Sequence, residues 1–192
     1  MDKKQEILHA AYALFCQKGE HLSMADLAEA VGIKTPSLYS HYAGKEEILT
    51  RMIEEEIRQY EESLQKLVQR LGDLSSYEAL KSFFFSILAY YQTENRLRFW
   101  RMLPLLQSVA LKETFAGAIG ETDRRNFAQI LQLLVRGKET GEVRIRDAES
   151  SLHLYFSMIQ GILEAMLLYP ERAEDLAFAE RIFEAYWAGI RA

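Results

Sequence analysis

The sequence predicts an all-α protein, on three observations. Only three prolines and ten glycines occur among 192 residues. Apolar residues recur at intervals of three and four along most of the chain, and no stretch alternates apolar with polar residues for long. With 49% hydrophobic residues, the chain can bury a substantial core. We expect about nine helices.

The first two helices have well-marked ends. Helix one is predicted over residues 3–18 and ends at Gly19, because glycine adopts a left-handed cap at little cost. Ser23 caps the second helix, and Asp26 three residues later completes an arrangement like a capping box. We expect this second helix to end at Gly32.

The third helix is predicted to be short and the fourth long. Thr35 followed by Pro36 indicates a helix start, because a proline in the first turn needs no amide donor and already has the helical φ. The third helix reaches about His41, since an Ala-Gly pair follows at 43–44, and Lys45 begins the fourth. The second and third helices then form a helix-turn-helix, which the first helix braces.

The rest of the chain also favours helices. They are expected to be separated at four places: 93–95, Pro104, 117–120 and 137–147. The last two helices are predicted over about 148–169 and 174–190, with Pro170 between them. Both have apolar faces wider than one side of a small domain requires, which indicates a further surface to cover.

The segment 32–49 is crowded with small hydroxyls, aromatic rings and a proline. Leu38 is the inward anchor of the third helix, which leaves most of its other side chains for the surface. Hydroxyls can approach base edges and phosphates, and Pro36 can contact a thymine methyl group. A helix N-terminus also favours phosphate. From spacing alone, a DNA-reading helix-turn-helix and a simple corner between two helices both stay open.

The charge balance argues mildly against nucleic-acid binding. The net charge is −5, and residues 1–50 hold five lysines and no arginine against seven acids. Any DNA binding must therefore depend on the local placement of groups.

The composition also bears on location. One cysteine, Cys16, excludes an intramolecular disulfide, fits a reducing compartment and has the apolar neighbours of a buried structural thiol. The first 15 residues have mixed charges, unlike a signal peptide, and the longest apolar run, 83–91, is far short of a membrane span. We expect a cytoplasmic protein with no membrane partner.

Several segments together carry a family resemblance. They are the spacing of Ala11, Phe15 and Gly19, the sequence MADLA at 24–28 with VGI at 31–33, and SLYSHY at 37–42 followed by KEEIL at 45–49. From Ile7 to Leu49 the chain resembles the N-terminal domain of the tetracycline-repressor (TetR) family of one-component bacterial regulators. The resemblance implies a helix-turn-helix DNA-binding domain at 1–46 and a helical effector-binding and dimerisation domain at 47–192.

The resemblance also implies a DNA-binding surface. Its residues are Ser23, Lys34, Thr35, Pro36, Ser37, Tyr39, Ser40, His41, Tyr42 and Lys45. The third helix would enter the major groove, with Lys34 at its entrance, while His41, Tyr42 and Lys45 contact or brace against phosphate. Two features depart from the family: Tyr42 stands where phenylalanine is more frequent, and Lys34 is the only cation of the third helix. Binding would therefore need two recognition helices, about 34–36 Å apart on a palindromic duplex operator.

The last two helices are the candidate interface of a homodimer. The proposed contact residues are Leu152, Phe156, Ile159, Leu163, Phe183, Tyr186 and Trp187. Gly161 would permit a close approach of two such helix pairs. Packing of the pair entirely within its own subunit is the alternative.

The resemblance further implies a cavity for an unknown small-molecule effector. Its candidate residues are Phe84, Tyr91, Phe99, Trp100, Leu103, Phe127 and Tyr155. Aromatic residues at helical spacing also suit an ordinary core. Nearby arginines are either a solvated basic face or the partners of an anionic or amphipathic effector, such as an acyl chain with an acidic head: Arg96, Arg98, Arg101, Arg124 and Arg125.

An enzyme is not expected. Glu6 and His9 form one Glu-x-x-His pair, but a di-iron bundle needs two. One cysteine and four histidines exclude a thiolate zinc site, and no nucleophile elbow or phosphate-binding glycine loop occurs. We therefore expect no cofactor or metal, and a DNA-binding repressor released by its effector. A helical dimeric interaction module that has lost DNA binding is the alternative, and it would lack a steep salt dependence.

Overall fold

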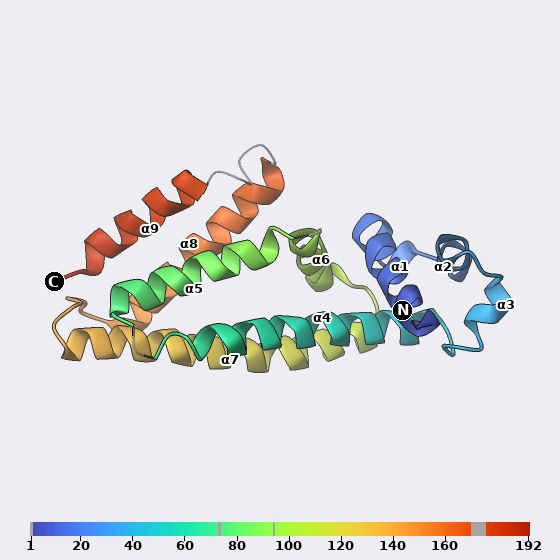
Figure 1. The fold of residues 1–192 in the computed structure, drawn as a ribbon, viewed down its shortest axis with the longest axis horizontal. Coiled ribbons are helices and arrows are strands. Elements are labelled where there is room, and N and C mark those ends of the chain that lie inside the picture. Colours follow the sequence, from blue (N-terminus) through green and yellow to red (C-terminus); the bar gives the residue numbers. More distant parts are fainter. Residues whose placement is uncertain (1, 73, 94, 170–175) are drawn as a thin grey trace. The chain divides into compact units, whose positions relative to one another are not determined.

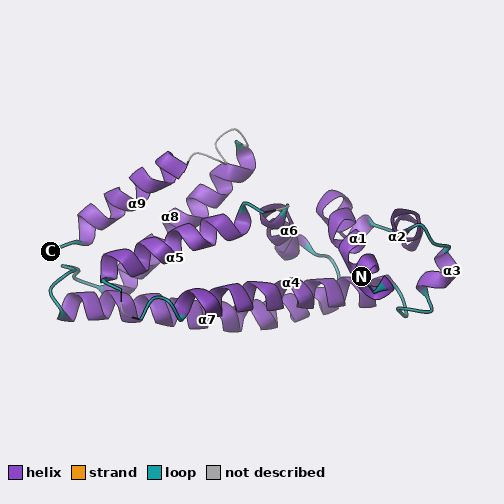
Figure 2. Ribbon diagram, in the orientation of Figure 1, coloured by secondary structure: helices purple, strands orange, loops and turns teal. Residues whose placement is uncertain are grey.

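The computed structural model describes residues 2–72, 74–93, 95–169 and 176–192. Within these residues it has nine α-helices and no β-strand, which confirms the all-α prediction (Figures 1 and 2). The helices are α1 Lys3–Lys18, α2 Met24–Val31, α3 Thr35–Leu38, α4 Lys45–Val68, α5 Ser76–Tyr91, α6 Arg96–Met102, α7 Val109–Glu139, α8 Ala148–Leu168 and α9 Leu176–Ile190.

The chain divides into two compact units. The first unit consists of residues up to 62 together with 98–121, and the second of 63–97 together with 122–192. The boundary expected between residues 46 and 47 lies inside α4, a continuous helix whose first part belongs to the first unit. As a division between DNA-binding and effector-binding functions, that boundary stays a prediction.

The helices α1 and α2 end at the predicted residues, although Gly19 caps α1 with ψ −140° instead of the expected left-handed conformation. Ser23 Oγ accepts a hydrogen bond from the Asp26 amide at 3.1 Å, and the Asp26 carboxylate accepts one from the Ser23 amide at 2.7 Å. These two bonds complete the capping box. Gly19 and Gly32 end the two helices with φ of 58° and 70°, and Gly32 is in the left-handed conformation.

Two helices differ from the prediction. The helix α3 stops at Leu38 instead of reaching His41, because the next residues form a turn in which the amides of His41 and Tyr42 both donate to the Leu38 carbonyl. The expected break at 117–120 is wrong, since α7 runs through it without interruption. Glycine inside a helix costs only about 1 kcal/mol relative to alanine, which helix hydrogen bonds and burial of the apolar side of α7 outweigh. The expected helix start at 174 lies outside the described residues.

The core of the first unit joins α6 to α1. Leu38 is fully buried beneath α3, as predicted. The ring of Phe99 stacks on Tyr12 at 4.9 Å and tilts against Phe15 at 5.4 Å. Cys16 is buried, and burial raises the pKa of its thiol to about 11, so it is a protonated structural thiol at neutral pH.

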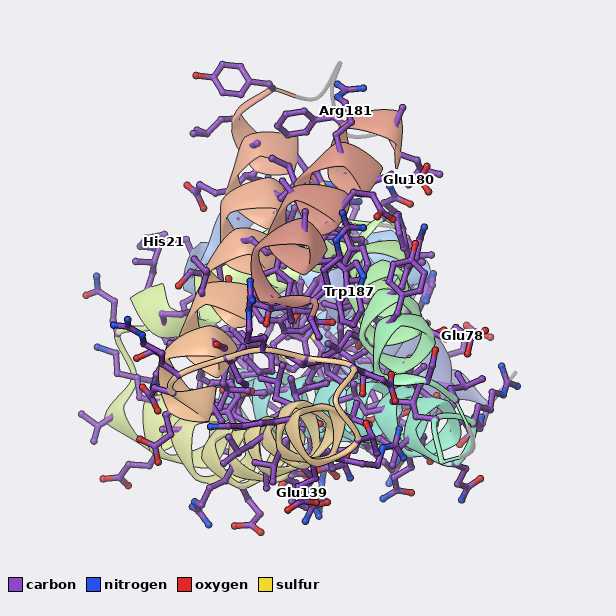
Figure 3. The ribbon with its side chains drawn as sticks, turned by 90° about the vertical axis from the view of Figure 1, so that its left-hand side faces the viewer. His21, Glu78, Glu139, Glu180, Arg181 and Trp187 are labelled. Atoms are coloured by element: carbon purple, nitrogen blue, oxygen red, sulfur yellow. The ribbon has the colours of Figure 1, made fainter. Side chains whose placement is uncertain are left out.

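The core of the second unit forms where α5, α8 and α9 pack together (Figure 1). Tyr155 is 0% exposed, and its hydroxyl donates to the Leu80 carbonyl at 2.6 Å. On another side of the contact between α5 and α9, Lys81 donates to Glu180 and Glu184, and Trp187 lies edge-on to Tyr77 at 5.2 Å. Figure 3 shows Glu180 and Trp187 on α9.

The helix α8 is the one helix among the described residues that is long and apolar enough to cross a membrane. It has 21 residues with a mean hydropathy of 1.3, and its apolar positions are spaced instead of forming one run. One of its faces forms the core of the second unit: Leu152, Tyr155, Ile159, Ile162, Leu163 and Met166. These buried residues account for part of the apolar composition of α8.

Candidate nucleic-acid interface

The helix α3 and the turn after it carry most of the predicted DNA-binding residues. Lys34 precedes the helix as its N-cap, and Leu38 fixes it to the core with 0% exposure. The side chains between and after these two are mostly outward: Pro36, Ser37, Tyr39 and Ser40 are exposed, while Thr35 and His41 are half-buried. One apolar anchor therefore supports a row of small or aromatic polar groups that are accessible to a partner.

Tyr42 braces the surface from inside. Its side chain is 7% exposed, and its hydroxyl donates to the Lys4 carbonyl at 3.3 Å. The Lys4 ammonium lies 5.7 Å from the centre of the Tyr42 ring. The hydroxyl that separates tyrosine from phenylalanine at this position thus ties the start of α1 to the turn after α3. Lys4 is a cation beside the surface that the sequence analysis missed, since no local motif marks it.

Lys45 is held by the turn between α1 and α2. Its ammonium donates to the Glu20 carbonyl at 2.7 Å, which orients the side chain and leaves two further N–H donors. In the first turn of α4, the Glu47 carboxylate accepts from the Ala43 amide at 2.6 Å. Lys45 therefore stands at a rigid helix start.

Ser23 serves mainly as a cap. Its hydroxyl donates to Asp26 at 2.7 Å, and its oxygen accepts from the Asp26 amide. In this arrangement the hydroxyl hydrogen is not available to a phosphate. The Lys18 ammonium donates to Asp26 at 2.6 Å, and this bond together with those from Ser23 lowers the pKa of Asp26 to about 2.

The capping box predicts a defined acid sensitivity. The pKa of Asp26 is about 2 in the folded chain against an ordinary 3.8. A depressed carboxyl pKa contributes stability above the ordinary value, and that stability is lost as pH falls through the folded value. We therefore expect Asp26→Asn to lower the stability at neutral pH and to remove the part of the acid sensitivity between pH about 4 and about 2. Thermal unfolding at neutral pH and across that pH range measures the loss of stability and the loss of acid sensitivity, with Glu29→Gln as the control. Parallel plots of stability against pH for the wild type and Asp26→Asn would contradict the prediction.

Gly32 fixes the turn between the two helices. Its φ of 70° is left-handed, although nothing lies within 4 Å of where a Cβ would stand. The cost of a side chain is therefore purely conformational, about 1–2 kcal/mol. We expect Gly32→Ala to lower the unfolding free energy by about this amount in denaturant titrations, and Gly32→Asn by less. Equal stability of the alanine variant and the wild type would show that the turn relaxes.

The residues predicted for a dimer interface lie largely inside the protomer. Five of them are covered by their own chain: Leu152, Ile159, Leu163, Phe183 and Tyr186. Phe156 and Trp187 are half-buried. Five of these seven residues therefore pack within the subunit, which is the alternative that the sequence left open. A dimer interface on α8 and α9 would have to use their other faces.

The residues predicted for an effector cavity are divided between the two units. Phe99, Trp100 and Leu103 belong to the first unit, and Phe84, Tyr91, Phe127 and Tyr155 to the second. Five are buried, whereas Phe127 is 36% exposed and Tyr91 is half-buried. The set is thus largely core, and its role in a cavity stays a prediction.

Comparisons with known proteins cover the segment that contains α3. Residues 7–52 match the family described as bacterial regulatory proteins, tetR family. The chain thus carries a TetR-family helix-turn-helix domain. It is a DNA-binding transcriptional regulator with a helix-turn-helix, and the matched segment contains every residue of the surface described above.

Similarity to named regulators extends beyond the helix-turn-helix. The chain is 24% identical to the uncharacterized HTH-type transcriptional regulator YvaF of Bacillus subtilis (strain 168), covering 100% of this chain and 96% of the relative. It is 22% identical to the fatty acid metabolism regulator protein of the same organism, covering 98% and 95%. The crystal structure of FadR from Bacillus subtilis in complex with stearoyl-CoA has the same fold, with a TM-score of 0.72, 15% identity and coverage of 96% and 98%. Both sequence relatives are named as regulators.

Proposed function

We propose that this TetR-family regulator is a cytoplasmic repressor, which binds a palindromic duplex operator as a homodimer and is released by an amphipathic acyl effector. The observation that carries the proposal is the surface of α3. Polar and aromatic groups are exposed there on a four-residue helix that one buried leucine anchors. Leu38 is the one buried residue of this helix, and its exposed groups match those that read base edges and phosphates.

Local placement offsets the acidic balance of the first 50 residues. Asp26 is paired with Lys18, and the Glu47 carboxylate is bound to a backbone amide. Lys34 and Lys45 stand at the two ends of the candidate surface, with Lys4 beside it. We infer that these lysines meet backbone phosphates, while Thr35 to Tyr39 face the bases.

The homodimer would use the outer faces of the last two helices. On α8, Leu154, Ser157, Gly161 and Leu168 are exposed at helical spacing, and Leu154 and Leu168 are 59% and 61% exposed. On α9 the exposed positions include small residues: Ala177, Ala185, Ala188 and Gly189. A self-complementary contact of these faces would bury the leucines and bring two helix pairs close together.

The effector class rests on the relatives and on charge. One relative is named a fatty acid metabolism regulator, and a protein of the same fold binds stearoyl-CoA. Arg98, Arg124 and Arg125 have exposed side chains that suit an anionic head group. The effector would bind more tightly to a dimer whose two recognition helices do not fit successive major grooves than to the DNA-binding dimer. DNA affinity would then fall by the ratio of the effector's affinities for these two dimer forms.

The test begins with enrichment of random duplex DNA by the purified protein, followed by a salt titration of the selected duplex. We expect a palindrome of two half-sites and a steep salt dependence. Stearoyl-CoA should then release the duplex, whereas CoA alone and stearate alone are the controls. A flat salt response, or no enrichment by a stable dimer, would instead support the interaction module. Selection of a palindrome that stearoyl-CoA leaves bound would refute the effector class alone.

A further inference from the structure

Glu20 connects the turn after α1 to the start of α7. It lies in the short 3-10 turn Gly19–His21. Its carboxylate accepts hydrogen bonds from two backbone amides just before α7, those of Gln107 and of Ser108, the latter at 3.0 Å. The partners are 87 and 88 residues apart in sequence and lie within the first unit.

The same place also holds the start of α4. The Glu20 carbonyl accepts from the Lys45 ammonium at 2.7 Å, and the Ser108 hydroxyl donates to Glu46 at 3.1 Å. The Ser108 oxygen in turn accepts from the Leu111 amide at 3.3 Å, inside the first turn of α7. We call Glu20, Lys45, Glu46 and Ser108, with the Gln107 amide, the Glu20 junction. It joins three helix termini through two carboxylates, one lysine and one hydroxyl.

While the junction is closed, the negative charge of the Glu20 carboxylate is stabilised by the Gln107 and Ser108 amides. Amides at a helix start carry partial positive charge and lack partners within the helix, so a carboxylate is stabilised there. The bond from Lys45 to the Glu20 carbonyl is one to a neutral group, and the full charge of Lys45 therefore remains for an anion outside the protein. If the start of α7 moved away, the released carboxylate would be free to form an ion pair with Lys45, which already donates to the carbonyl of the same residue.

The geometry points to the Glu20 junction as a latch that sets how much of the charge of Lys45 DNA can use. In the closed state Glu20 caps α7, and Lys45 is available to a phosphate. In the open state the freed carboxylate competes with that phosphate. The inference rests on the proposed contact of Lys45 with DNA and adds the means by which movement of α7 changes it. By linkage, duplex binding must favour the closed latch to the same extent.

The test opens the latch without removing the acid. Ser108→Pro deletes an amide donor to Glu20, whereas the control Ser108→Ala loses the same hydroxyl but keeps the amide. We expect Ser108→Pro to bind the selected duplex about five- to tenfold more weakly than Ser108→Ala. Its salt slope should fall by about one phosphate contact. Adding Glu20→Gln to Ser108→Pro should restore both values, because a neutral amide cannot pair with Lys45.

The outcomes separate the latch from a structural role. Equal affinity of the proline and alanine variants, or failure of Glu20→Gln to restore the salt slope, overturns the latch. If Ser108→Pro does not fold, hydrogen exchange in the wild type decides, since duplex must slow exchange of the Gln107 and Ser108 amides. Unchanged exchange in a protein that binds duplex refutes the latch alone, whereas a wild type that binds no duplex refutes the proposed function and the latch with it.

Discussion

Replacing Gly161 by arginine is expected to leave the protomer folded and to lower operator affinity by about 100-fold or more. Gly161 lies exposed in the middle of α8, and nothing stands within 4 Å of where its Cβ would be. Within one protomer the change should even stabilise the helix by about 1 kcal/mol, because glycine is a poor helix former. On the proposed dimer face, however, a long cation would face its own symmetry copy.

The measurement combines molar mass in solution with duplex binding. Wild type is expected to be a dimer, and Gly161→Arg a monomer that binds the palindrome only through single half-sites. Gly117→Arg is the matched control, since Gly117 is also an exposed helix glycine with nothing within 4 Å, but lies on α7. A dimeric Gly161→Arg with unchanged affinity would place the interface elsewhere.

Replacing Tyr155 by alanine is expected to cost about 3–5 kcal/mol of unfolding free energy. Its ring is completely covered and touches those of Phe84, Phe156 and Tyr186, with centres 5.5–6.5 Å apart. Tyr155→Phe keeps the ring and loses only the bond to the Leu80 carbonyl, which is worth about 1 kcal/mol. Burial also raises the pKa of this hydroxyl well above its ordinary value, so it stays protonated and able to donate.

Denaturant unfolding measures both losses, and the phenylalanine variant separates two roles for Tyr155. If Tyr155 is only a core residue, Tyr155→Phe should respond to stearoyl-CoA as the wild type does. A normally stable Tyr155→Phe that no longer responds would place the hydroxyl in the effector cavity, as the sequence analysis expected. A stable Tyr155→Ala would contradict the packing described for the second unit.

Features that depend on neighbours in the chain could be predicted well. Ser23 and Asp26 lie three residues apart, so their capping box is fixed by one turn of helix. Gly32 was found by its freedom to adopt positive φ, and Leu38 by being the one large aliphatic residue among polar neighbours. The error at Gly117 and Gly120 has the opposite cause, because propensity is a weak local preference that packing along 31 residues of α7 overrides.

The sequence by itself determined most of the helices, the helix-turn-helix and the family resemblance, because all three depend on residues within a few turns of one another. Only the tertiary structure decided which apolar face of α8 is covered: Ile159 points inward and Leu154 outward, although periodicity marks both as apolar. It alone also brought Glu20 to the start of α7, since a contact across 87 residues leaves no local pattern. Folding brings the Glu20 carboxylate to the Gln107 and Ser108 amides, and residues so far apart in the sequence form no motif that would predict this contact.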